Sequence, residues 1–218
     1  MNLEAGYSFK RRVMGIGCIL AALFLLAGAW VIPFVFESSS ILYKFGMDKL
    51  LLRSAKIFGL TAAVMIFYQV LVMSRFKMIS WIFLLKHLHM FHKKNGILIA
   101  LFALFHPMLI VSSENFTFFT FEKKYWPEWL GSGLLVFLLF VILTAIFRNR
   151  LVWAYKTWLR WHRFSSMTIV LVMLVHIFFV SDTFASGFPR QLVFFAGGLY
   201  FLLFARIMYY RLFADRSS

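Results

Sequence analysis

The sequence predicts an all-α membrane protein, a bundle of six transmembrane helices, and three observations support this fold class. First, 62% of the 218 residues are hydrophobic and only 14% are charged, a composition far outside the range of soluble domains. Second, six apolar runs each approach the length that crosses a bilayer. Third, the charges fall mainly between these runs, so a net charge of +15 indicates membrane topology and no nucleic-acid partner is expected.

The expected helices span, in chain order, residues 14–36, 57–73, 91–111, 131–147, 162–180 and 192–210. The first run is uncharged and follows three basic residues, so a signal peptide is the rival interpretation. Its length and its poor cleavage site favour a helix that stays in the bilayer. No linker or low-complexity segment interrupts the chain, and residues 1–218 are expected to form a single domain.

The segments between the runs are expected to be interfacial. Residues 37–56 and 112–130 are expected as loops, the first with charges of both signs and the second polar and aromatic. The basic segment 75–94 contains a short apolar patch, residues 81–85, of the kind that lies in the membrane interface. Residues 148–163 interleave bases with tryptophans, which indicates an aromatic and basic membrane anchor better than a nucleic-acid surface.

The distribution of basic residues predicts the orientation. Most of the 23 Lys and Arg residues lie in the N-terminal tail, the second and fourth loops and the C-terminal end, whereas most acidic residues lie in the other three loops. By the positive-inside rule, both termini are expected in the cytoplasm of a multi-pass protein in the lipid bilayer of a bacterial inner membrane. The third and fifth helices then both run outward.

Two of the expected helices carry histidines with the same spacing. His92 and His106 lie in the third helix, His162 and His176 lie in the fifth, and fourteen residues separate the members of each pair. Fourteen residues of α-helix advance about 21 Å and return to within roughly 40° of the same azimuth, so each pair lies on one helix face. We therefore expect His92 and His162 near the inner face and His106 and His176 closer to the outer face.

These histidines favour two haem sites stacked across the membrane between the third and fifth helices. A single intramembrane histidine is equally well explained by a hydrogen bond to a neighbouring helix, but two pairs at matching depth indicate a function. Zinc prefers ligands gathered at one point, and a proton relay would use intramembrane Asp or Glu, which none of the six runs contains. Facing neutral imidazoles suit a six-coordinate haem in an apolar slot.

Other polar residues near these helices have simpler interpretations. His87 and His89 are expected at the interface, without a cofactor role. Lys93, Lys94 and Arg163 are interpreted as positive-inside charges, with pairing to the propionates of the inner haem as the alternative. Cys18 is the one cysteine of the chain, so no CxxCH motif holds a haem covalently.

The segments FHKKNGILIALFALFHP, with His92 and His106, and WLRWHRFSSMTIVLVMLVH, with His162 and His176, carry a family resemblance. In them the chain resembles the ferric reductase-like transmembrane domain shared by NADPH oxidases, ferric reductases and the haem membrane subunit of the methionine sulfoxide reductase system. The resemblance implies two haems b, the inner one ligated by His92 and His162 and the outer one by His106 and His176.

The resemblance further implies electron transfer from a cytoplasmic donor, through the inner and then the outer haem, to an extracytoplasmic acceptor. Ferric iron, oxygen and a partner reductase are the candidate acceptors. Many relatives continue into FAD- and NAD(P)H-binding domains, but this sequence has no dinucleotide-binding glycine fingerprint. FAD and NAD(P)H are therefore expected only through a separate flavoprotein, with a quinol as the other donor, unless the chain is a fragment.

Two alternatives to a self-contained reductase remain open. In the first, the chain is a haem-containing anchor and electron conduit for a partner oxidoreductase and has no substrate site of its own. In the second, it is a transporter that contains no haem. Copurification with an oxidoreductase favours the conduit, and a colourless protein favours the transporter.

Overall fold

The computed structural model describes residues 3–37, 45–74, 76–113 and 122–209. Its α-helices are α1 (Leu3–Val35), α2 (Gly46–Met73), α3 (Lys77–Ile82), α4 (Leu85–Ser113), α5 (Trp126–Ile146), α6 (Tyr155–Val180) and α7 (Gly187–Tyr209). Three short 3-10 segments join them: η2 (Lys123–Tyr125), η3 (Arg148–Arg150) and η4 (Asp182–Phe184). Within these described ranges there is no strand.

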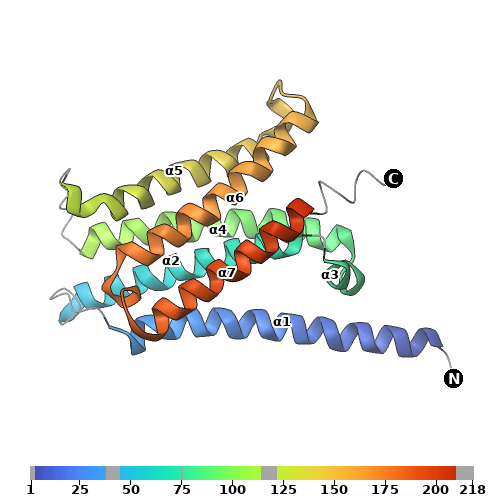
Figure 1. The fold of residues 1–218 in the computed structure, drawn as a ribbon, viewed down its shortest axis with the longest axis horizontal. Coiled ribbons are helices and arrows are strands. Elements are labelled where there is room, and N and C mark those ends of the chain that lie inside the picture. Colours follow the sequence, from blue (N-terminus) through green and yellow to red (C-terminus); the bar gives the residue numbers. More distant parts are fainter. Residues whose placement is uncertain (1–2, 38–44, 75, 114–121, 210–218) are drawn as a thin grey trace.

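The long helices form an up-and-down bundle. Helices α1, α4 and α6 run in one direction and α2, α5 and α7 in the other, so α1 begins and α7 ends at the same end of the bundle (Figure 1). Basic side chains gather at this end, which we call the basic end: Lys10, Arg11, Arg12, Lys77, Lys86, Lys93, Lys94, Arg148, Arg150, Lys156, Arg160, Arg163 and Arg206. The acidic residues Glu37, Asp48, Glu128 and Asp182 lie at the other end, which we call the opposite end.

Six of the described helices, all except α3, are long and apolar enough to cross a membrane. Each of them contains one of the six predicted apolar runs, almost in full, and the predicted all-α architecture is therefore confirmed. Many large apolar side chains point away from the bundle; Phe24 of α1 is 78% exposed and Phe201 of α7 is 67% exposed. A belt of this size requires an apolar surrounding, which a lipid bilayer supplies.

The helices begin earlier than the sequence predicted. Residues 46–56, which were expected as a loop, form the first turns of α2, and residues 126–130, expected as part of another loop, open α5. Hydropathy detects only the hydrocarbon slab, whereas a helix continues through polar turns at the interface. The start of α2 is set by two residues of its first turn. Gly46 adopts a positive φ of 60°, and Asp48 complements the helix dipole.

The core of the bundle lies where α2, α4, α5, α6 and α7 meet. Ile99 of α4 and Val170 of α6 are each 2% exposed, and they belong to one buried cluster with Val141 of α5 and Tyr200 of α7. The Tyr200 hydroxyl donates to the Met167 carbonyl across 2.8 Å and so ties α7 to α6. Since lipid is as apolar as these side chains, close packing and such interhelical hydrogen bonds hold the bundle together.

Asn95 provides a direct test of this interhelical bonding. It is 3% exposed, and its side-chain Nδ2 donates to the Met65 carbonyl of α2 across 3.0 Å. We expect Asn95→Ala to lower the free energy of unfolding by about 1 kcal/mol, because the lost bond joins two helices inside the bilayer. Ser132→Ala is the matched control, since its hydroxyl donates within α5 itself. Equal unfolding free energies of the two variants in detergent titrations would contradict the expectation.

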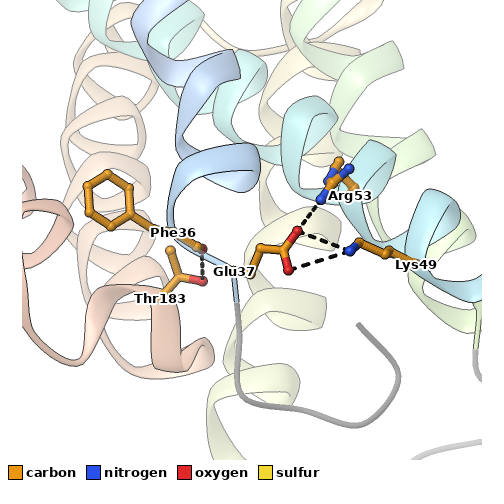
Figure 2. A network of polar contacts seen from close by, with 5 residues as sticks. All are labelled: Phe36, Glu37, Lys49, Arg53 and Thr183. Carbon is orange, nitrogen blue, oxygen red and sulfur yellow. Dashed lines mark hydrogen bonds and ion pairs between the residues drawn. The ribbon is translucent and has the colours of Figure 1, made fainter. Parts of the chain in front are cut away.

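A polar network closes the opposite end of the bundle (Figure 2). Glu37, just after α1, pairs with Lys49 of α2 at 3.2 Å and accepts a hydrogen bond from Arg53 one turn later. Thr183 of η4 donates to the Phe36 carbonyl across 3.2 Å. Half-exposed ion pairs of this kind contribute little to stability by themselves. Their role is to hold the ends of α1, α2 and η4 in register.

Candidate functional site

The two histidine-bearing helices, α4 and α6, each pack mainly against another helix. Helix α4 packs along α2 and α6 packs along α5, but α4 and α6 do not pack closely along one another. Both run from the basic end, and His92 and His162 lie equally far from the starts of their helices. The structure therefore places the two pairs at matching levels, as the common spacing predicted.

The imidazoles of the pair nearer the basic end face each other. The ring centroids of His92 and His162 are 6.2 Å apart, and the ring planes are inclined at 80°. Two imidazoles that ligate one metal ion from opposite sides, with metal–nitrogen bonds of about 2 Å, have centroids about 6 Å apart. The observed separation thus fits a metal ion shared by the two rings.

A cavity of about 320 Å³ adjoins this pair. His92, His162 and Lys93 line it, and most of the remaining wall consists of apolar side chains from α2, α4, α5 and α6. Cofactor sites commonly occupy about 300–1,000 Å³ and combine apolar walls with a few fixed polar groups. The cavity suits a flat apolar ring, and Lys93 in its wall supplies a positive charge suited to acidic substituents.

The pair nearer the opposite end is held differently. His106 Nδ1 lies 2.7 Å from the Ala55 carbonyl of α2, and His176 Nδ1 lies 2.9 Å from the Pro127 carbonyl of α5. A carbonyl oxygen only accepts, so each Nδ1 carries the proton and each Nε2 keeps its lone pair for a metal. Both rings are thereby held in direction as neutral imidazoles.

The pair at the basic end lacks this support. The Nδ1 atoms of His92 and His162 are buried, and neither has a hydrogen-bond partner among the described residues. Trp158 instead stacks on the His162 ring, with centroids 5.1 Å apart and an interplanar angle of 20°. The Arg148 guanidinium lies 5.4 Å from the Trp158 ring. The segment that contains Trp158 was interpreted only as a membrane anchor, although the spacing of four residues between Trp158 and His162 on one helix already places their side chains on the same face.

The structure distinguishes among the basic residues and histidines that were considered beside the four central histidines. Of the three basic residues considered near the histidine pair at the basic end, Lys93 lines the cavity, whereas Lys94 and Arg163 are not part of its wall. His87 and His89 are exposed on the first turns of α4, in agreement with an interfacial position. Among the described residues, no three His, Cys, Asp or Glu side chains come close enough together to hold a metal ion. The candidate metal-binding groups are therefore the two separate imidazole pairs.

Comparison with known proteins gave one family. The model described as "Ferric reductase like transmembrane component" matches residues 58–175, more than half of the chain. His92, His106 and His162 lie inside this range, and His176 follows its last residue directly. Neither the curated proteins nor the solved structures gave a match. The family resemblance predicted from the two histidine segments is therefore confirmed.

Proposed function

Because the chain belongs to the family of ferric reductase-like transmembrane components, we propose that it carries electrons across a membrane by means of two haems b held between α4 and α6. His92 and His162 would hold the inner haem, and His106 and His176 the outer one. A bound haem b supplies a one-electron carrier whose potential is set by its axial ligands and surroundings.

The facing imidazoles of His92 and His162 carry this proposal. Their 6.2 Å separation and the adjoining apolar cavity fit a ligated, flat cofactor. The Nδ1 atoms of both rings are buried without a partner among the described residues, so each ring leaves a polar atom unsatisfied beside this cavity. The second pair, at the same spacing on the same two helices, supports a second site.

The protein's own residues supply position and a dry environment. The outer imidazoles donate from Nδ1 to backbone carbonyls, so their Nε2 atoms stay deprotonated and fixed in direction. Ile99, Val141 and Ile169 are buried and form part of the apolar wall of the inner cavity. This apolar wall would reduce the solvation of charge on a bound haem and so shift the reduction potential of the haem.

The orientation follows from the charges, and the direction of transfer from the cytoplasmic donor that the family resemblance implies. If the basic end lies in the cytoplasm, as the positive-inside rule requires, electrons move outward from the inner to the outer haem. The donor is then a flavoprotein or a quinol at the basic end. The acceptor at the opposite end is ferric iron, oxygen or a partner reductase. In the last case the chain acts as the conduit subunit of a larger oxidoreductase.

Electron transfer across sealed liposomes tests the proposal. The protein is reconstituted with haem into vesicles that enclose ferricyanide, and dithionite is added outside. We expect the trapped ferricyanide to be reduced several times faster than in protein-free vesicles and in vesicles made with haem-free protein. A haem-loaded protein that gives only the rate of the protein-free vesicles would overturn the proposal.

A further inference from the structure

The two outer histidines, His106 and His176, are held by the same arrangement of a backbone carbonyl and a glycine, on α2 and on α5 respectively. The carbonyl that accepts from His106 belongs to Ala55, four residues before Gly59 on α2. The carbonyl that accepts from His176 belongs to Pro127, four residues before Gly131 on α5. In each case a carbonyl and a glycine one helical turn later meet one imidazole.

Helix geometry explains why the fourth residue is glycine. Side chains on an α-helix tilt toward its N-terminus, so the side chain of residue i+4 covers the carbonyl of residue i. A Cβ atom on Gly59 would lie 2.8 Å from His106 Nδ1, and one on Gly131 would lie 2.8 Å from His176 Nδ1. Both distances are shorter than Cβ atoms tolerate. Glycine leaves the carbonyl open, and the imidazole fills the space.

We propose that Gly59 and Gly131 are positioning residues for the outer haem ligands, and that the outer site alone depends on them. This inference rests on the proposed ligation by His106 and His176. A methyl group at either glycine can be accommodated only if the ring moves, since the other side of the contact is the helix backbone itself. That movement would break the hydrogen bond to the carbonyl and change the direction of Nε2, the atom that would bind the outer haem.

The inner pair has no such arrangement of carbonyl and glycine. Replacing either glycine should therefore affect haem binding at the outer site only. No described glycine has His92 or His162 among its nearest neighbours, and the Nδ1 atoms of both lack a partner within the described ranges. Loss of groups that orient a metal ligand commonly weakens metal binding by about 10- to 100-fold. We expect that loss at the outer haem, with the inner haem unchanged.

Haem content and spin state provide the first test. Gly131→Ala and Gly59→Ala are purified beside Gly133→Ala, the control on the same helix as Gly131, where a Cβ meets nothing within 4 Å. The two test variants should retain about one low-spin haem per chain, and the control about two. The inference is overturned if the test variants keep both low-spin haems, lose both to the same degree, or match Gly133→Ala.

A double-mutant cycle tests the contact without relying on haem. Gly131→Ala is expected to lower the thermal unfolding temperature in the wild-type background, but to have little effect in the His176→Ala background, where the ring is gone. Equal shifts in both backgrounds contradict the inference. A wild-type protein that binds no haem, yet shows this coupling, refutes the proposed function and leaves the positioning of His176 by Gly131 intact.

Discussion

Replacing His176 by alanine is expected to leave one haem on the chain in place of two, with the outer haem lost and the inner haem retained. The outer iron would keep His106 as its single imidazole, and a haem that is held non-covalently in an apolar slot depends on its axial bonds. His92 and His162 are not altered, and their facing geometry 6.2 Å apart does not involve His176. The pyridine haemochrome assay measures the haem per chain.

The same result is expected for His106→Ala, because the two residues would hold the same iron. His87→Ala and His89→Ala are the matched controls, since these histidines are exposed on the first turns of α4 and should leave both haems in place. If His176→Ala, folded and inserted in membranes, lost both haems equally, the assignment of the four ligands to two levels would be wrong.

Replacing His92 or His162 is expected to give the reverse pattern and a larger functional effect. The outer haem remains on its carbonyl-supported ligands, His106 and His176. Electrons supplied at the basic end must then reach it without an intermediate carrier, across the about 21 Å that fourteen helical residues span. Reduction of the outer haem from the basic end should therefore fall at least tenfold, whereas reduction from the opposite end should be unchanged.

Stopped-flow absorbance with an impermeant reductant on one side of oriented vesicles separates these two rates. His89→Ala again serves as the control, and it should match the wild type from both sides. The expectation is contradicted if His92→Ala still allows the outer haem to be reduced from the basic end at the wild-type rate.

Much of the fold was predictable because the bilayer imposes it. Apolar runs must form helices in lipid, so the six crossings followed from hydropathy alone. The residues at which the helices start could not be predicted from hydropathy, because a helix continues through polar turns beyond the hydrocarbon region. The first turn of α4, with Lys86 and His87, is an example. The start of α2 depends on Gly46 and Asp48, which give no hydropathy signal.

The candidate site was predictable to the level of its histidines. Equal spacing on parallel helices was enough to pair His92 with His162, and the structure brings these two rings together. The supporting groups were not predictable from spacing. Gly59 and Gly131 lie on α2 and α5, and only the packing of α2 on α4 and of α5 on α6 places them against histidines. The stacking of Trp158 on His162 was missed although the sequence carried its signal, because the two residues lie four apart on α6.

The central claim is that four histidines hold two haems, and one measurement tests it most directly. The purified protein, expressed with haem available, is examined by a reduced-minus-oxidised absorbance spectrum and by quantifying its haem against protein. The account predicts two haems b per chain with a low-spin spectrum. A folded, colourless protein that takes up no haem would contradict the account and favour a transporter without a redox cofactor.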